Sequence, residues 1–298
     1  MGIKKIELKD VKRPVKGRGI VILALKHNLY ARYAHNLILS LRQPNNGLFK
    51  AGIEICLVAD QGRLNEVGVK TTVMVDETIT VSEDQSYNPF FTKLFIDQLS
   101  PYEETLLLDA DMLAMPDANL PALFDSMKDV EFTCSNRGWI TRQSGGYDWA
   151  DVTSLLDAAG VDQMPHVSSE FVYFKKTKKV VELFDKARTF YLTNNVVNTF
   201  IGTHQPDEPA LSYGITKAGI QLPEMPYHPS FWEGHYKGVA FKPQQIYRHT
   251  FLSVGGSMLS NQTTKIYDGL LKGYAIKGNT TYYPYTAKGK VIKERLLL

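Results

Sequence analysis

TLLLDADML, residues 105–113, is a short apolar run that ends in two carboxylates, Asp109 and Asp111. The run has the length and composition of a buried strand in a parallel sheet. In open α/β sheets, ligands bind beyond the carboxyl ends of the strands, which is where this pair stands. The stretch therefore indicates either an acidic turn or a metal site at the end of a central strand.

The spacing of the two carboxylates favours the metal site. Side chains repeat with period two in an extended chain, so Asp109 and Asp111 point the same way there. Neighbouring carboxylates repel each other, and their hard oxygens are ligands that Mn²⁺ and Mg²⁺ accept. Asp-x-Asp alone is a weak signal because any acidic loop supplies it. The buried run before it favours a bound Mn²⁺ or Mg²⁺.

Strand and helix patterns alternate on both sides of this stretch. Apolar runs predict strands at 19–25, 53–60, 71–76, 130–136 and 168–174. Helical periodicity predicts helices at 30–43, 89–100, 120–127 and 179–192. This alternation predicts an α/β fold with a Rossmann-like, mostly parallel mixed sheet that is flanked by helices.

Composition is that of a soluble globular protein. The chain has 298 residues, of which 44% are hydrophobic and 22% charged. No apolar stretch approaches the roughly 18 residues of a membrane span, and the first residues carry no apolar signal region. Cys56 and Cys134 both stand in strand patterns, which indicates reduced core thiols. We therefore expect a cytoplasmic protein.

The positive charge lies at the carboxyl end of the chain. In residues 261–298, six lysines and one arginine stand against Asp268 and Glu294, interleaved with five tyrosines. We expect a nucleotide-sugar domain over 1–260 and a basic, Tyr-rich extension over 261–298. The extension suits an anionic surface, either a membrane or DNA, to which the protein would be peripheral. Alternatively, its tyrosines pack it back on the domain.

Three segments, 19–43, 90–125 and 168–174, resemble glycosyltransferase family 8, the glycogenin and bacterial galactosyltransferase group with the GT-A fold. The strongest block is 92–124, where TKL, TLLL, DAD and NLPALF follow in the order typical of the family. The resemblance spans about 19–249. It implies a GT-A fold and a nucleotide-sugar donor, usually a UDP-sugar, bound through a divalent cation.

The resemblance also implies roles for donor-binding residues. Asp111 would ligate the metal most directly, and Asp109 would share the metal and the ribose. Lys93 would support the donor sugar or its phosphate. Leu25 and Tyr30 fall in the loop where the family frames uracil, although this loop is one residue longer here.

A late histidine completes the metal site in the family. His228, His235 and His249 are candidates, and His249 is preferred because it ends a strand-like segment, QQIYRHTF, that is followed by SVGG. The His-x-x-Gly-x-x-Lys pattern of the family is not kept. Arg248 or Lys93 would then clamp the diphosphate.

The family places an Asp-Gln pair near the anomeric carbon, and this chain has Asp207 and Glu208. Because family members retain the anomeric configuration, Glu208 would stabilise an oxocarbenium-like centre or trap the sugar covalently. Alternatively, the two acids complement a helix dipole. Ser168 and Ser169 match a small-residue pair that touches the donor, or they are strand-edge residues.

Together these features predict a metal-dependent glycosyltransferase, either a hexosyl- or a pentosyltransferase. It would move the sugar from a nucleotide-sugar such as a UDP-hexose to an acceptor hydroxyl, with retention. The sequence does not decide whether the acceptor is a glycan, a glycolipid, a protein or a nucleic acid, since the choice of acceptor depends on loop shapes. Two alternatives remain open. One is a non-catalytic protein that binds a sugar nucleotide or a nucleic acid, and the other is a metal-dependent nucleotide hydrolase.

Overall fold

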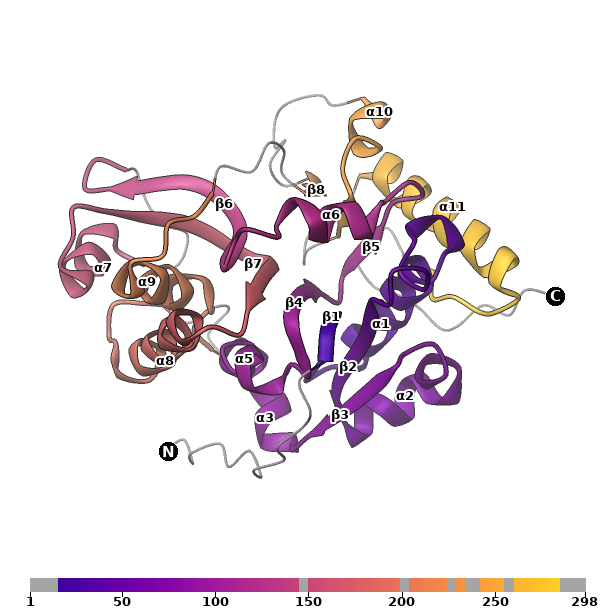
Figure 1. Ribbon diagram of the computed structural model, residues 1–298, viewed down its shortest axis with the longest axis horizontal. Helices are drawn as coiled ribbons and strands as arrows, with labels where there is room; N and C mark the ends of the chain where they lie inside the picture. Colours follow the sequence, from indigo (N-terminus) through magenta and orange to yellow (C-terminus); the bar gives the residue numbers. More distant parts are fainter. Residues whose placement is uncertain are drawn as a thin grey trace.

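The computed structural model describes residues 16–144, 150–198, 204–223, 229–233, 242–254 and 260–284. Its centre is a six-stranded mixed sheet in the order β3-β2-β1-β4-β7-β6 (Figure 1). The first four strands of this order are parallel, and β7 and β6 are antiparallel to their neighbours. The strands are β1 Lys16–Ala24, β2 Glu54–Asp60, β3 Glu77–Val81, β4 Tyr102–Asp109, β6 Phe132–Thr141 and β7 Gln163–Lys175.

A second, three-stranded sheet follows directly on β4. It has the order β5-β9-β8, in which β9 is antiparallel to β5 and parallel to β8. Its strands are β5 Met112–Ala114, β8 Ser230–Trp232 and β9 Phe251–Ser253. Because β5 begins one residue after Asp111, the acidic pair lies at the junction of the two sheets.

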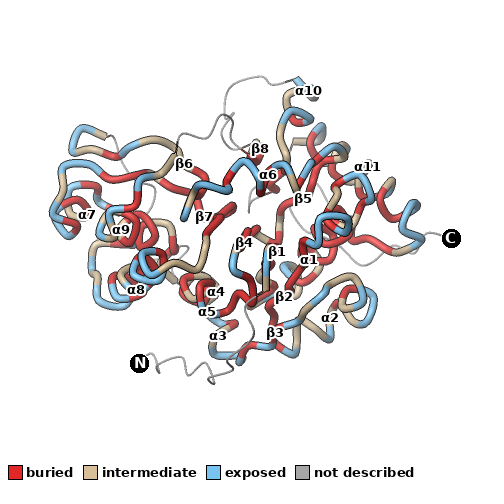
Figure 2. The backbone as a smooth tube through the Cα atoms, viewed as in Figure 1, coloured by how far each residue is buried: buried red, intermediate tan, exposed pale blue. Residues whose placement is uncertain are grey.

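Helices cover both faces of the large sheet because successive residues of a strand point to opposite faces. Ile20 and Ile22 of β1 pack in one core with α1 and α11, whereas Val21 packs in another core with α8 and α9. Buried residues accordingly follow the central strands and the inner helix faces (Figure 2). The longer helices are α1 Asn28–Leu41, α2 Gln61–Thr72, α8 Lys178–Thr193, α9 Glu208–Ala218 and α11 Asn261–Gly278.

Shorter helices connect these elements. They are α3 Glu83–Tyr87, α4 Pro89–Lys93, α5 Ile96–Leu99, α6 Leu120–Ser126, α7 Val152–Ala159 and α10 Pro243–Ile246, with a 3₁₀ turn at Pro44–Asn46. Within the described ranges, no helix combines the length and the apolar composition needed to cross a membrane. Cys56 and Cys134 are buried and free, as predicted.

Close packing of α9 against α8 fixes the position of the first residues of α9. A Cβ atom at Gly214 would lie 2.5 Å from the Leu183 carbonyl oxygen, so only glycine fits at this crossing. Leu211 and Ile215 are buried against α8 in the same core. The packing therefore holds Asp207 and Glu208, at the start of α9, in a defined place.

The first part of the predicted C-terminal extension is packed in the core. Tyr267, Tyr274 and Tyr283 belong to the same buried cluster as α1 and β1, and α11 lies beside α1 (Figure 1). Asn36 Nδ2 donates to the Tyr283 carbonyl at 2.7 Å, and the Tyr283 N–H donates to Asn36 Oδ1 at 2.9 Å. For residues 260–284, the alternative in which the tyrosines pack the chain back on the domain is confirmed. Residues 285–298 lie outside the described ranges.

Three sequence-based predictions of secondary structure were wrong. The strand predicted at 71–76 is the end of α2 and the turn after it, because Asp60 caps the helix and Val73 faces solvent at 72% exposure. The helix predicted at 89–100 is two short helices, α4 and α5. The strand-like segment 244–251 is α10 and a turn, and β9 begins only at Phe251.

Candidate functional site

The acidic pair stands at the carboxyl end of a central strand, as predicted. Asp109 is the last residue of β4, which lies between β1 and β7, and it is in register with Leu23 of β1. Asp111 lies in the turn between β4 and β5. The pair is therefore held by strand pairing on both sides of the turn.

Lys93 joins this strand end to two other elements. Its Nζ lies 2.5 Å from Asp109 Oδ1 and 3.9 Å from Asp207 Oδ2, and it donates to Ser169 Oγ at 3.0 Å. Lys93 ends α4, whose first turn is capped by Asn88. Burial alone would lower the pKa of Lys93, but Asp109 and Asp207 outweigh it and raise the pKa above its ordinary value. Lys93 is thus a buried, charged centre of the site.

Asp207 occupies the N-cap position of α9 but does not cap the helix with its side chain. The residue is 2% exposed, and its carboxylate faces Lys93 and Ser169. Burial raises the pKa of Asp207, while Lys93 and Ser169 counteract the rise. A carboxylate that only complemented the helix dipole would not need to face the end of β4. The orientation of Asp207 therefore favours a role in the site.

Glu208, the first residue of α9, has a strongly shifted pKa. Burial raises the pKa of Glu208 to about 7, with Arg137 and Ser168 acting in the opposite direction and Asp207 adding to the rise. A carboxyl group with a pKa near 7 is suited to act as an acid, a base or a nucleophile at neutral pH. Both predicted serines, Ser168 and Ser169, lie in β7 and are buried beside these acids.

Arg137 is a residue of this site that sequence reasoning missed. The pairing of β6 with β7 shifts register between Asn136 and Trp139, and Gly138 has φ 108° at this bulge. Bulges re-aim side chains beside active sites. Here the guanidinium of Arg137 lies 5.4 Å from the centroid of the Trp232 ring and close enough to Glu208 to lower its pKa. In the sequence, a glycine after an apolar strand run, here Gly138, is the pattern that indicates such a bulge.

Negative charge exceeds positive charge around Asp111. Burial, Asp109 and Glu170 together raise the pKa of Asp111 well above its usual range, although Lys93 opposes them. Glu170 is itself 9% exposed and accepts a hydrogen bond from Ser230 Oγ at 2.6 Å. Three carboxylates near one lysine form an environment that a divalent cation would neutralise. Sequence reasoning also missed Glu170. The pattern that could have identified it is a charged residue inside an apolar strand.

The structure does not bring His249 or Arg248 to the acidic pair. β5 and β9 are antiparallel, with Met112 opposite Ser253 and Ala114 opposite Phe251. Asp111 therefore lies beside Val254, whose N–H donates to its carbonyl at 2.9 Å, whereas His249 lies beyond the other end of the pair. The expectation that His249 ends a strand is wrong, because its segment is a turn.

Instead, His249 and Arg248 line a small cavity of about 150 Å³ together with Asp117. In the part of the chain that the structure describes, no group of three His, Cys, Asp or Glu side chains could hold a metal ion. The other two candidates, His228 and His235, lie outside the described residues. Asp109 and Asp111 are thus the predicted ligands that the structure brings together.

Leu25 and Tyr30 have different environments. Leu25 is 2% exposed and packs in the core with α8 and α9, so its side chain does not face a ligand. Tyr30 is 39% exposed, and burial together with Asp111 and Asp109 raises its pKa to about 12. Tyr30 is therefore near the acidic pair.

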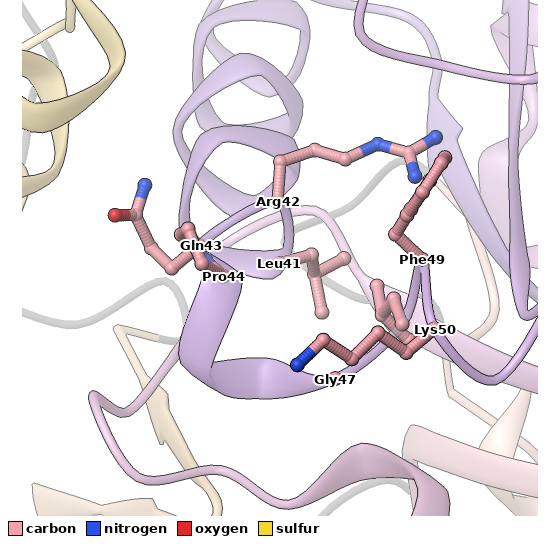
Figure 3. A pocket seen from close by; sticks show the side chains of 8 residues that line it. Leu41, Arg42, Gln43, Pro44, Gly47, Phe49 and Lys50 are labelled. Carbon is pink, nitrogen blue, oxygen red and sulfur yellow. The ribbon is translucent and has the colours of Figure 1, made fainter.

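A larger cavity of about 290 Å³ lies at the far end of α1 and is not part of this site. It is lined by Leu41, Arg42, Gln43, Pro44, Gly47, Leu48, Phe49 and Lys50 (Figure 3). Helix α1 starts beside the strand ends and runs 14 residues to Leu41. At about 1.5 Å per residue, this cavity lies roughly 20 Å from the loop after β1.

No protein-family model and no curated protein sequence matches this chain. Solved structures do match it. The galactosyltransferase LgtC in complex with donor and acceptor sugar analogs is 13% identical over 87% of this chain and 95% of that chain, with a TM-score of 0.52. An active-site glutamine-to-glutamate mutant of LgtC, at 13% identity and the same coverage, has a TM-score of 0.54.

The glycosyltransferase GlyE of Streptococcus pneumoniae TIGR4 is 12% identical over 91% of this chain and 66% of that chain, with a TM-score of 0.52. These likenesses extend over most of the chain. The chain therefore has the GT-A fold of these glycosyltransferases, as its sequence predicts.

Proposed function

We propose that this protein is a metal-dependent glycosyltransferase that moves a hexose from a UDP-sugar or similar donor to an acceptor hydroxyl, with retention. The observation that carries the proposal is the contact of the largely buried Lys93 with Asp109 and with the buried Asp207. A buried ion pair contributes little net stability compared with apolar residues of similar size. Groups with shifted pKa values that converge at a strand end are typical of an active site.

The residues at this strand end fit a divalent cation. Asp109 and Asp111 would hold Mn²⁺ or Mg²⁺, and the surplus of negative charge around Asp111 is what such an ion compensates. When bound, the cation acts as a Lewis acid towards the diphosphate of the donor. Lys93 adds a fixed positive charge, held in place by Asp207 and Ser169.

Glu208 supplies the group that retention requires. In its ionised form, the carboxylate attacks the anomeric carbon while the bond from that carbon to the diphosphate breaks and its electron pair leaves with the nucleoside diphosphate. The acceptor hydroxyl then attacks the same carbon, releases Glu208 and gives its proton to a phosphate oxygen. Two inversions at one carbon give net retention. Arg137 and Ser168 favour the ionised form of Glu208, which is the first residue of α9.

The comparison with solved structures supports this proposal through the fold. LgtC is described as a galactosyltransferase with donor and acceptor sugar analogs bound, and its glutamine-to-glutamate mutant is described as an active-site mutant. This chain naturally carries an Asp-Glu pair where the family pattern is Asp-Gln. A nucleotide-sugar donor is therefore the substrate class that we propose.

The proposal is tested by incubating the purified full chain with Mn²⁺ and a panel of nucleotide-sugars, with and without glycan, glycolipid, protein and nucleic-acid acceptors. We expect release of a nucleoside diphosphate and transfer of the sugar to one acceptor class. Release of the diphosphate with no transfer to any class would favour a nucleotide hydrolase. Binding without any turnover would favour a non-catalytic binding protein.

A further inference from the structure

The most exposed apolar side chains gather at the ends of three helices. The turn after α1 carries Phe49, the last turns of α2 carry Val69 and Val73, and the last turn of α11 carries Ile276. These four side chains are 60% to 92% exposed. Elsewhere among the described residues, Tyr87 is the one large apolar side chain that is exposed as far. Apolar exposure that is concentrated in one place marks a contact surface.

Hydrogen bonds hold these three helix ends together. Arg42, the C-cap of α1, donates from Nε to the Met74 carbonyl just after α2, at 2.6 Å. The two ring nitrogens of His35 bond to Thr71 Oγ1 of α2 at 2.8 Å and to the Thr281 carbonyl after α11 at 3.0 Å. Helices α2 and α11 accordingly both pack against α1 (Figure 1). The exposed apolar residues therefore belong to one end of the molecule.

The cavity of about 290 Å³ at the end of α1 opens at this place. Leu41, Leu48 and the ring of Phe49 give it apolar walls, and the cations of Arg42 and Lys50 border it (Figure 3). The hollow thus combines apolar surface with positive charge.

The same combination recurs on the other two helix ends. An exposed apolar residue is followed directly by an exposed lysine in three pairs, which are Phe49–Lys50, Val69–Lys70 and Ile276–Lys277. We refer to these three pairs as the Phe49 face. One such pair would be ordinary on a protein surface, but three pairs on helix ends that pack together form a surface that is both apolar and basic.

Acidic side chains at this end of the molecule are balanced by other cations. Asp76, which follows α2, lies 2.5 Å from Arg42 Nη2. Glu54 and Glu77, at the starts of β2 and β3, lie 3.0 and 2.8 Å from Lys16 Nζ. The lysines of the Phe49 face therefore add a net positive charge to it.

We propose that the Phe49 face docks on the surface of an anionic lipid bilayer. Aromatic and aliphatic side chains enter the boundary between headgroups and acyl chains, and neighbouring lysines are attracted to anionic headgroups. The phosphates of DNA would match the lysines but offer no partner to Val69 and Ile276. A second copy of the chain would match the apolar side chains but would bring lysines against lysines.

This face is separate from the donor site. Helix α1 starts beside the strand ends that carry Asp109 and runs 14 residues, which is about 20 Å at about 1.5 Å per residue. The residues of the face can therefore be replaced without touching the donor site. Binding to vesicles tests the inference whether or not the protein has the proposed activity.

Sedimentation of the full chain with vesicles of phosphatidylcholine, with and without phosphatidylglycerol, tests the inference. We expect binding only where phosphatidylglycerol is present. Phe49→Ala should weaken it about 10-fold because a ring no longer enters the bilayer. Lys70→Gln and Lys277→Gln should each weaken it about 5-fold.

Matched controls lie on α8, which covers the opposite face of the large sheet. Leu192→Ala removes an apolar side chain that is also exposed, and Lys178→Gln removes an exposed lysine. Both variants should bind vesicles as the wild type does. A tryptophan at position 49, in Phe49→Trp, should shift its emission to shorter wavelength on anionic vesicles, whereas Leu192→Trp should not.

Two results would overturn the inference directly. One is failure of the wild type to bind anionic vesicles, and the other is wild-type binding by both Phe49→Ala and a Lys70→Gln, Lys277→Gln double variant. All these variants keep residues 285–298, so unchanged binding would place the vesicle contact outside the Phe49 face.

Two further results would give the face a different occupant and would also contradict the inference. Binding to duplex DNA that the lysine variants weaken and Phe49→Ala leaves unchanged would make it a nucleic-acid surface. A dimer in solution that Phe49→Ala abolishes, detected by light scattering, would make it an interface between copies of the chain.

Discussion

Lys93 Nζ lies 2.5 Å from Asp109 Oδ1 and 3.9 Å from Asp207 Oδ2, so one ammonium joins the end of β4 to the start of α9. The side chains of Lys93 and Asp207 are 12% and 3% exposed. Removing the cation would leave a buried carboxylate uncompensated, which is costly. Substitution of Lys93 should therefore change both the stability and the activity of the protein, and the two effects can be measured separately.

Replacing Lys93 with Met should lower the free energy of unfolding by about 3 kcal/mol, the typical cost of breaking a buried pair. It should also reduce donor hydrolysis by about 100-fold or more because a fixed positive charge at the diphosphate is lost. Urea denaturation and diphosphate release check the two effects. Lys50→Met, at an exposed position, is the control and should change neither. Wild-type hydrolysis by Lys93→Met would show that the ion pair is structural only.

The pKa of Glu208 makes stability depend on pH. Its pKa rises from an ordinary 4.5 to about 7 in the folded chain. The protonated carboxyl therefore stabilises the fold fully below pH 4.5, and this stabilisation is lost as the pH rises through about 7. We expect the free energy of unfolding of metal-free protein to fall across this window. Glu208→Gln, which cannot titrate, should show a shallower fall between pH 5 and pH 8 in urea denaturation. Identical slopes for the two proteins would contradict the burial of this carboxyl.

His249→Ala should leave Mn²⁺ affinity within about 2-fold of the wild type. The register of β5 and β9 separates His249 from Asp111, and loss of a true ligand or its supporting shell costs about 10-fold or more. A Mn²⁺ titration of His249→Ala beside His228→Ala and His235→Ala checks this. A drop of 10-fold in His249→Ala alone would restore it as the third ligand.

Two truncations separate the packed and the basic parts of the C-terminus. Removing 261–298 deletes Tyr267 and Tyr274 from the core, so we expect loss of cooperative folding. Removing only 285–298 spares every described residue and should leave the melting temperature and donor hydrolysis unchanged. It deletes four basic residues, so binding to anionic liposomes or to duplex DNA should weaken. Equal binding of both surfaces by the full and the shorter chain would exclude 285–298 as an anionic-surface contact.

The parallel half of the sheet and the acidic strand end could be predicted because each rests on local pattern. The apolar run before Asp109 forms the end of β4, as expected, and Lys93 of the TKL motif is the last residue of the short helix α4. The strand predicted at 71–76 was wrong because α2 continues to Thr72, with Thr71 bonded to His35 in the core, and a turn follows.

Other parts of the site could not be predicted because they depend on contacts between distant segments. Arg137 reaches the site through a bulge in β6, and Glu170 through its place in an antiparallel strand. The distance between His249 and Asp111 has the same origin, since only the register of β9 with β5 decides which residue lies beside Asp111.

Nucleoside diphosphate release from a UDP-sugar by the wild type and Asp111→Asn, across a range of Mn²⁺ concentrations, tests the account most directly. Asp111→Asn keeps the shape of the side chain but removes the charge that a cation would balance. We predict that the wild type releases diphosphate in a Mn²⁺-dependent manner and that Asp111→Asn loses about 100-fold or more of this activity at every Mn²⁺ concentration. Near wild-type, Mn²⁺-dependent turnover by Asp111→Asn would contradict a metal-dependent transferase site at the end of β4.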